Sequence, residues 1–168
     1  MDVADLRSLY LRELQELCDC HSQMAPAFRN MATAAGSVEV RNAIAQQVEA
    51  AVLHKQRLEK ILHCHGSRPK ADSDEVAAAY VKRAEHVMHS TPDPNLRDAA
   101  LISMLRRIGQ YEATGLAAAE CYAETLYLGI DRHTLLASMR EQRAADGRLA
   151  AFQNEANQLA LLVSTPPY

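Results

Sequence analysis

Hydrophobic side chains recur at intervals of three and four residues along most of the chain, with polar residues between them. This period is typical of helices that bury one face. Near the N-terminus the buried face would comprise Leu6, Tyr10, Leu14, Leu17, Met24, Phe28 and Met31. The later stretches place Ile44, Val48, Val52, Leu58 and Leu62 on a second face, Leu101, Leu105, Ile108, Gly115, Ala119, Tyr122 and Leu126 on a third, and Leu135, Met139, Leu149, Ala156 and Ala160 on a fourth. The pattern therefore predicts amphipathic helices.

Helix-breaking residues separate these stretches. They cluster at 36–37, 65–69, 90–94 and 129–131. The breaks predict four long helices at about 3–34, 37–65, 94–128 and 131–163, and a short helix at about 73–89. A helix of roughly 30 residues is about 45 Å long. The residues expected to cap helix N-termini are Ser37, Asp72 with Glu75 at capping-box spacing, Asp93 before Pro94, and Asp131.

Four long helices of similar length favour an all-α four-helix bundle, formed by a single domain over residues 1–168. The segment between the second and third long helices is longer than a tight helix–helix turn. It can therefore cross the length of the bundle, with the short helix inside it, so that the third long helix runs parallel to the second. A bundle with one such crossover has the topology of ferritin-like folds.

Composition supports this fold class and argues against two kinds of partner, nucleic acids and membranes. The 168 residues include 29 alanines but only six glycines and six prolines, which favours helices over a β-sandwich or a disordered chain. The net charge of −3 argues against nucleic-acid binding, and no apolar run reaches the length of a membrane span. Four irregularly spaced cysteines, and an N-terminus unlike a secretory signal, predict a cytoplasmic protein.

Polar residues interrupt the predicted buried faces near the middle of every long helix. They are His21, Glu49 beside the second face, Glu112, Gln142 and Asp146. If the first hairpin turns at its break, residue numbers that add to about 71 face each other, and His21 lies opposite Glu49 or its neighbours. If the second turns near residue 130, the numbers add to about 261, and Glu112 lies near Asp146. Because an unpaired buried carboxylate costs several kcal/mol, such a layer indicates pairing, protonation or metal binding.

Two segments of the third long helix resemble a known family. Leu96–Ile102 reads LRDAALI, and Gln110–Ala113 reads QYEA. They resemble the "VRDAALI…EHYEIA" segment of the bacterial YciF/YciE-type ferritin-like proteins, a stress-associated family. Shorter pieces at 9–17 (LYLRELQEL), 57–59 (RLE), 128–131 (LGID) and 144–146 (AAD) support the resemblance, which covers almost the whole chain.

The resemblance also implies a di-iron-type site, with which this chain agrees only in part. Glu49, Glu112 and Asp146 match family carboxylates, whereas His21 and Gln142 stand where the family has Glu. Val52, Gly109 and Gln110 replace a His, a Glu and a His. Three interpretations stay open. The layer is metal-free, with His21 paired to Glu49 or Glu112 and Gln142 bonded to Asp146; or these five residues hold one divalent ion (Fe, Mn or Zn); or they form a working two-metal centre.

Two other groups contain metal-binding residue types. Cys18 and Cys20 point about 200° apart on a helix and cannot hold one ion together, and His54 of the next helix is expected near Cys18. We interpret the His63-Cys64-His65 run as a surface cluster at a helix end. Its alternative role is to hold a metal ion, including one shared between two copies of the chain.

The sequence thus favours a structural or associative bundle with at most a reduced metal site, and the resemblance suggests a homodimer. The alternative is a Fe, Mn or Zn protein that performs oxygen- or peroxide-linked redox chemistry at the polar layer. A third function class is an interaction module that binds a partner through exposed helix faces. The sequence identifies no catalytic residue and no small-molecule substrate, since it contains neither a phosphate-binding glycine loop nor a nucleophile elbow.

Overall fold

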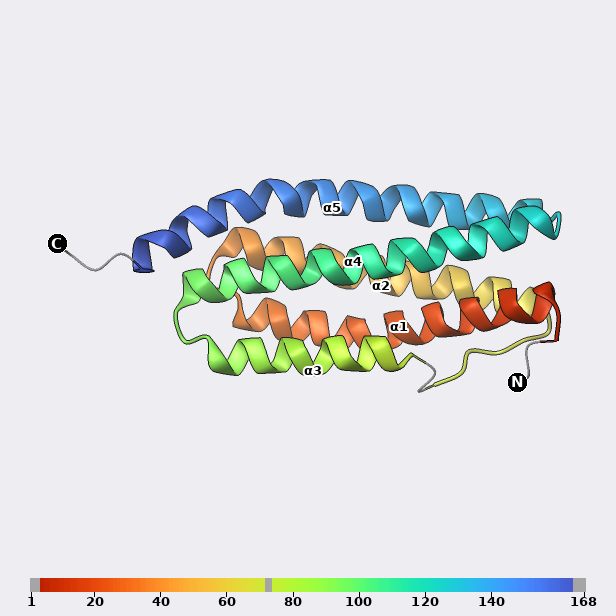
Figure 1. Cartoon of the computed structure of the whole chain (residues 1–168), viewed down its shortest axis with the longest axis horizontal. Helices are drawn as coiled ribbons and strands as arrows, with labels where there is room; N and C mark the ends of the chain where they lie inside the picture. The colour runs from red at the N-terminus through yellow and green to blue at the C-terminus, as the bar shows by residue number, and fades with distance from the viewer. Residues whose placement is uncertain (1–3, 72–73, 165–168) are drawn as a thin grey trace.

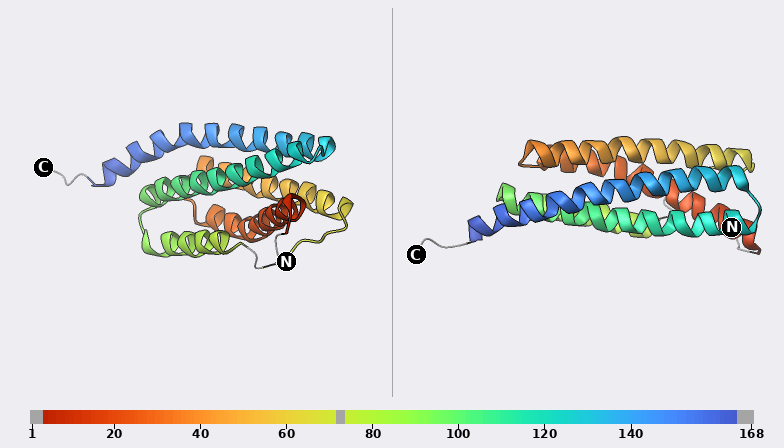
Figure 2. Two further views of the ribbon diagram at one scale, coloured as in Figure 1. Left: turned by 45° about the vertical axis from the view of Figure 1, so that its right-hand side comes forward. Right: turned by 90° about the horizontal axis from the view of Figure 1, so that it is seen from above.

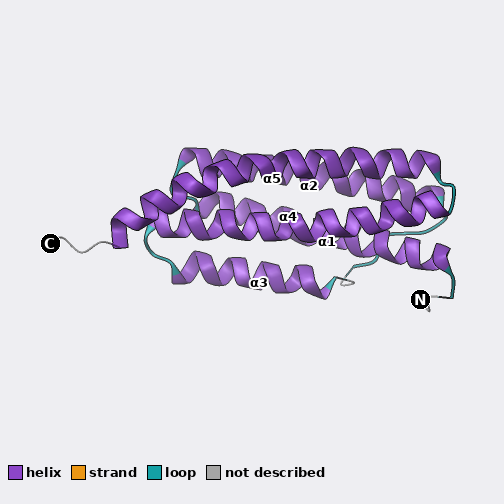
Figure 3. Ribbon diagram, turned by 45° about the horizontal axis from the view of Figure 1, so that its top comes forward, coloured by secondary structure: helices purple, strands orange, loops and turns teal. Residues whose placement is uncertain are grey.

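The computed structural model describes residues 4–71 and 74–164, and its fold is built from helices. They are α1 (Leu6–Ala34), α2 (Val38–Cys64), α3 (Glu75–Ser90), α4 (Pro94–Thr125) and α5 (Gly129–Ser164). The described ranges contain no strand (Figure 3). None of the helices in these ranges combines the length and the hydrophobicity that spanning a bilayer requires. The predicted all-α fold is confirmed, and each helix lies close to its predicted range.

The long helices form two antiparallel hairpins, α1 with α2 and α4 with α5, joined by the segment that contains α3 (Figure 1). This segment carries the chain back along the bundle, so that α4 runs parallel to α2 (Figure 1). α3 packs on α1 and α4, outside the four long helices (Figure 2). The predicted four-helix bundle, with one long crossover and a short additional helix, is therefore confirmed.

Polar side chains cap helix N-termini at two of the predicted positions. Ser37 accepts a hydrogen bond from the backbone of α2, and Asp93 accepts two from the backbone of α4. Asp74 caps α3, while the predicted cap Asp72 lies outside the described residues. The prediction for Asp131 is wrong, because α5 begins at Gly129 and Asp131 lies inside its first turn. Its carboxylate contacts Tyr10 of α1 and His65, the residue that follows α2, instead.

The Arg97-Asp98 pair anchors the turn between α1 and α2. The buried carboxylate of Asp98 accepts hydrogen bonds from the backbone N–H groups of Gly36 and Ser37, each at 2.8 Å. Arg97 donates from Nε to the carbonyl oxygen of Ala34, also at 2.8 Å. A Cβ on Gly36 would lie only 2.7 Å from the first residue of α4, so this close approach requires glycine. The motif that carries the family resemblance thus fixes the first turn against the start of α4.

The hydrophobic core is divided into two clusters along the bundle. One cluster, on the side of the α1–α2 turn, includes Met24, Phe28, Met31, Ile44, Leu101 and Leu105. The other, on the side of the α4–α5 turn, includes Tyr10, Leu14, Leu17, Leu58, Leu62 and Leu116. Full burial of one such large side chain stabilises the fold by about 1.5–3 kcal/mol. Glu112 falls between the two clusters in the numbering of α4, and His21 of α1 lies 3.3 Å from it, so this region holds the candidate site.

Candidate functional site

A layer of polar side chains crosses the bundle between the two hydrophobic clusters. His21 of α1, His54 of α2, Glu112 of α4 and Gln142 of α5 each expose no more than 5% of their surface. The imidazole rings of His21 and His54 have centroids 5.5 Å apart. The amide of Gln142 lies against Gly109, one turn of α4 before Glu112. Each of the four long helices therefore contributes a buried polar group.

Among the described residues of this layer, Glu112 is the one that carries a carboxylate, and it is buried. Its Oε1 lies 3.3 Å from Nδ1 of His21 and 3.9 Å from Sγ of Cys20. Neither ring nitrogen of His21 makes a well-directed hydrogen bond in the part of the chain that the structure describes. Burial, together with the charge of Glu112, raises the pKa of the Cys20 thiol, which therefore stays protonated and can donate to the carboxylate. His21 faces Glu112 at ion-pair distance but is poorly aligned with it.

His54 reaches the bundle surface through a hydrogen bond to Glu141, which forms an ion pair with Arg57. Its Nε2 lies 2.9 Å from Oε2 of Glu141, and Arg57 binds both oxygens of the same carboxylate at 2.7 and 2.9 Å. The bond from Arg57 is the main cause that holds the pKa of Glu141 below its usual range. Burial lowers the pKa of His54, and the nearby imidazole of His21 lowers it further. These shifts favour a neutral His54 that donates from Nε2 to Glu141.

The structure does not bring Glu49 and Asp146 into this layer. Glu49 is exposed on the outer face of α2. Asp146 is half-buried and accepts hydrogen bonds from Nε of Arg106 at 2.9 Å and from the amide of Gln110 at 3.2 Å. The predicted proximity of His21 to Glu49 and of Glu112 to Asp146 is therefore wrong. Of the five predicted site residues, His21 and Glu112 come together in the bundle interior, and Gln142 is buried beside Gly109, one turn away from Glu112.

The position of the second turn explains the error for Asp146. α4 ends at Thr125 and α5 begins at Gly129, so opposing residue numbers in this hairpin add to about 254. The smaller number places Gln142, and not Asp146, at the level of Glu112. A turn displaced by three or four residues thus moves the opposing residue by about two helical turns.

His54 belongs to the layer, although the sequence analysis did not include it among the site residues and expected it near Cys18. The buried face of α2 contains Ile44, Gln47, Ala51, His54 and Leu58, whereas Val52 is 37% exposed. The prediction followed the apolar residues Val48 and Val52 and so selected a neighbouring face. A sequence signal was present, because Ile44, Ala51 and Leu58 are spaced by seven and His54 completes their helical face.

The residues present do not fit a two-metal centre. Ferritin-like di-metal sites take a Glu from each of two helices and a Glu-x-x-His motif from each of the other two. Here the described layer holds one buried carboxylate, two imidazoles and a neutral amide, and Nε2 of His54 is already bonded to Glu141. Among the residues that the structure describes, no group of three or more His, Cys, Asp or Glu is placed to hold a metal ion.

A second polar cluster closes the end of the bundle where α1 begins. Nε2 of His65 lies 2.6 Å from Oδ2 of Asp131, and Nδ1 of His65 accepts from Arg7 at 2.9 Å. The hydroxyl of Tyr10 donates to the same carboxylate oxygen at 3.1 Å, and its ring packs edge-on against His65. The interpretation of His63-Cys64-His65 as a surface cluster is thus wrong for His65, which joins α1, α2 and α5. His63 and Cys64 are exposed, as expected.

Comparisons with known proteins agree with the fold. The structure superposes on that of the Escherichia coli stress protein YciF with a TM-score of 0.88, at 18% sequence identity, over 93% of this chain and 99% of that chain. It is similar to YcfI of Rhodopseudomonas palustris, provisionally described as a structural protein, with a TM-score of 0.84, at 19% identity, over 89% and 95% of the two chains. No curated protein matches the chain.

A family model also matches the chain, over residues 5–161. The match includes all of α1 to α4 and most of α5, and with them the polar layer and the cluster at the bundle end. The chain belongs to the family described as "Domain of unknown function (DUF892)".

Proposed function

We propose that this protein is a structural, self-associating helical bundle of the stress-associated type, and that its polar layer sets the helix register instead of performing redox chemistry. The composition of the layer is the observation that supports this proposal. Among the described residues of the layer Glu112 is the one carboxylate, and the other members are the amide of Gln142, the imidazole of His21 and the Glu141-bound imidazole of His54. Such a set lacks the carboxylates that two metal ions would need.

A buried polar layer can specify a fold even where it adds little stability. Sliding one helix by a turn would separate His21 from Glu112, and Gln142 from Gly109, leaving polar groups against apolar side chains. An unsatisfied buried polar group costs about 1–3 kcal/mol, so the shifted registers are disfavoured. The layer then defines one alignment of four Ala-rich helices whose apolar faces are otherwise permissive.

A reduced metal site is the second candidate function, and the unpaired nitrogens of His21 favour it. Within the described residues both ring nitrogens are buried without directed partners, and one lies 3.3 Å from Glu112. An imidazole and a carboxylate would supply two ligands of types that Zn²⁺, Mn²⁺ and Fe²⁺ accept. A single ion bound there would stabilise the native state in proportion to its affinity.

Metal titration separates the two candidates. The purified chain is analysed for metal by mass spectrometry and then loaded anaerobically with Fe²⁺, Mn²⁺ or Zn²⁺ while its melting temperature is followed. We expect no stoichiometric metal and an unchanged melting temperature. One equivalent of metal that raises the melting temperature, is lost in Glu112→Gln and is retained in the matched surface variant Glu49→Gln would contradict the proposal and establish the reduced site.

The self-associating part of the proposal concerns the end of α5. This helix extends beyond the other long helices (Figures 1 and 2), and its last turns expose Leu159, Leu161 and Leu162. Exposed leucines grouped in this way are typical of contact surfaces, and the homodimer expected from the sequence would cover them. Light scattering of the wild type should give twice the chain mass of 18.6 kDa. The variant Leu162→Glu should have the mass of a monomer, whereas Ile130→Glu, at the opposite end of α5, should keep the mass of a dimer. A monomeric wild type would contradict the proposal.

A further inference from the structure

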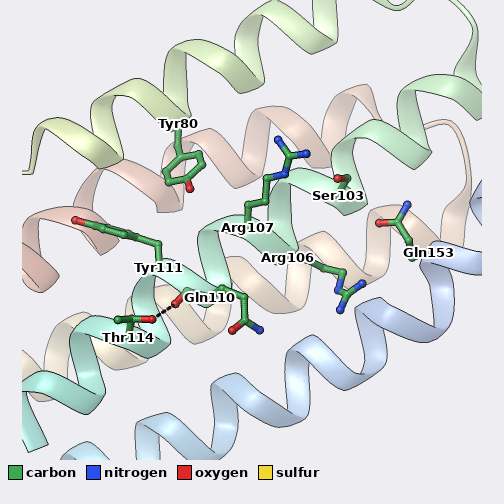
Figure 4. A pocket seen from close by; sticks show the side chains of 8 residues that line it. All are labelled: Tyr80, Ser103, Arg106, Arg107, Gln110, Tyr111, Thr114 and Gln153. Atoms are coloured by element: carbon green, nitrogen blue, oxygen red, sulfur yellow. Dashed lines mark hydrogen bonds between the residues drawn. The ribbon is translucent and has the colours of Figure 1, made fainter.

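An open groove runs along the outward face of α4, between α3 on one side and α5 on the other (Figure 4). Its volume is about 570 Å³, within the range of small-molecule sites. Tyr80 comes from α3, Gln153 from α5, and the floor from α4, which contributes Ser103, Arg106, Arg107, Gln110, Tyr111 and Thr114. It is separate from the polar layer, which lies inside the bundle.

The two consecutive arginines of the groove point to opposite walls (Figure 4). Arg106 extends toward α5, where its Nε donates to Asp146 at 2.9 Å. Arg107 extends toward α3 and lies between Tyr80 and Ser103 in Figure 4. Within the described part of the chain, Arg107 makes no hydrogen bond and no ion pair. The charge of Arg106 is thus neutralised, and that of Arg107 is available.

The groove offers hydrogen-bond donors and lacks anionic acceptors. No Asp or Glu is among the residues that line it. The hydroxyls of Tyr80 and Ser103, like the guanidinium of Arg107, have no side-chain partner among the described residues. The groove thus combines donors from two helices with one uncompensated positive charge, a set suited to an oxyanion, and three donors match the several oxygens of a phosphate.

An aromatic wall stands beside these donors. The rings of Tyr80 and Tyr111 have centroids 6.1 Å apart and are tilted by 52°. The hydroxyl of Tyr111 donates to the buried carboxylate of Asp74 at 2.9 Å, and burial together with this bond raises the pKa of Tyr111. The bond holds the Tyr111 ring in place, so that the aromatic wall is ordered before any ligand arrives.

We propose that this groove binds a small aromatic phosphate of the nucleoside-monophosphate class. The phosphate would be held by Arg107 and the hydroxyls of Tyr80 and Ser103, while the planar ring would pack against the tyrosine wall. One available arginine on an acidic chain favours a single small anion over a nucleic-acid strand, which requires several phosphate contacts. This site is independent of the proposed structural function, which stands whether or not the groove binds a ligand.

Titration with adenosine 5′-monophosphate, followed by amide chemical shifts, tests the proposal. We expect saturable shifts at Tyr80, Ser103 and Arg107, and weaker binding of both adenosine and inorganic phosphate. Arg107→Ala should weaken binding by at least about tenfold, the loss expected for a charge-assisted hydrogen bond. The matched variant Arg140→Ala removes an exposed arginine of α5 and should bind like the wild type.

Any one of four outcomes would overturn the proposal. The wild type shows no shifts in the groove at about 5 mM nucleotide, which is above the range of weak specific binding. Arg107→Ala and Arg140→Ala bind the nucleotide equally well, which would mean that the anion is not held in the groove. Inorganic phosphate binds as tightly as the nucleotide, or Tyr80→Leu binds as tightly as the wild type, which would eliminate the aromatic contact. Arg107 is exposed, so its truncation should leave the far-UV circular dichroism and melting temperature unchanged.

Discussion

The polar layer in the middle of the bundle and the polar cluster at its end both contain a histidine beside a carboxylate, but they differ in how completely their hydrogen bonds are made. At the end, Nε2 and Nδ1 of His65 bind Asp131 and Arg7 at 2.6 and 2.9 Å. In the middle, His21 is almost fully buried, and neither of its nitrogens has a directed partner within the described residues.

Position along the helices accounts for the difference. Asp131 lies in the first turn of α5, where the helix N-terminus favours a negative charge, and His65 follows the last residue of α2, where the chain can turn to meet it. His21 and Glu112 sit in the interior of continuous helices, so their backbones cannot adjust to improve the contact. The deeper polar cluster is thus the less satisfied one, which favours the proposed role in specificity over a role in stability.

Removal of the Asp131 carboxylate should have the largest effect on the free energy of unfolding. Asp131→Ala removes the acceptor shared by Tyr10 and His65 and should lower the free energy of unfolding by about 2–4 kcal/mol, measured by urea denaturation. Glu39→Ala is the control, because Glu39 is an exposed acid in the first turn of α2 and should cost about 0.5 kcal/mol. Equal losses in the two variants would show that the end cluster adds nothing beyond the helix dipole.

Replacement of His21 and Glu112 should change the free energy of unfolding in the opposite direction. The double variant His21→Leu with Glu112→Leu exchanges a buried, misaligned pair for apolar side chains and should raise the free energy of unfolding by about 1–3 kcal/mol. Urea denaturation gives this value, and amide spectra of the variant report whether a single helix register persists. A loss of stability similar to that of Asp131→Ala would erase the distinction between the two clusters.

Substitution of Gly109 tests how tightly the amide of Gln142 is packed against α4. A Cβ at this position would lie 2.5 Å from Nε2 of Gln142, so Gly109→Ala must displace the buried amide. This displacement should offset the helix-propensity gain of about 1 kcal/mol and leave the stability in thermal unfolding about unchanged. Gly147→Ala is the matched variant on α5, with no atom within 4 Å of the new Cβ, and should gain about 0.5–1 kcal/mol. If both alanines stabilise the fold, Gln142 is not held against α4.

The smallest expected effect is on the pH dependence of stability. Burial lowers the pKa of His54 in the folded state, so the unfolded chain binds the proton more readily. The contribution of neutral His54 is therefore fully present above the ordinary pKa of 6.5 and is lost as the pH falls from there toward the folded pKa. His54→Gln should flatten the decline of stability between about pH 6.5 and pH 5. The exposed His86→Gln should leave the decline unchanged; identical profiles for the two variants would contradict the assignment.

Local sequence patterns determined the helices of this protein and their order. Three- and four-residue spacing of apolar side chains specifies each helix, and breakers with capping residues such as Ser37 and Asp93 specify most ends, because these effects act within one or two turns. The length of the crossover was enough to predict that α4 runs parallel to α2. His21, Glu112 and Gln142 were also predictable as inward-facing, since each interrupts an apolar stripe on its own helix.

Only the tertiary structure decided which of these side chains meet. A displacement of the α4–α5 turn by a few residues moved Asp146 out of the layer and placed Gln142 in it. α2 turns Glu49 outward and buries His54 on the face that it shares with Ala51 and Leu58. The spacing of apolar residues is compatible with this face and with a neighbouring one, and packing decides between them. The bonds of His65 and the groove beside Arg107 likewise join helices far apart in sequence. Such contacts depend on helix rotation and register, which are set by packing between elements and not by the period within one of them.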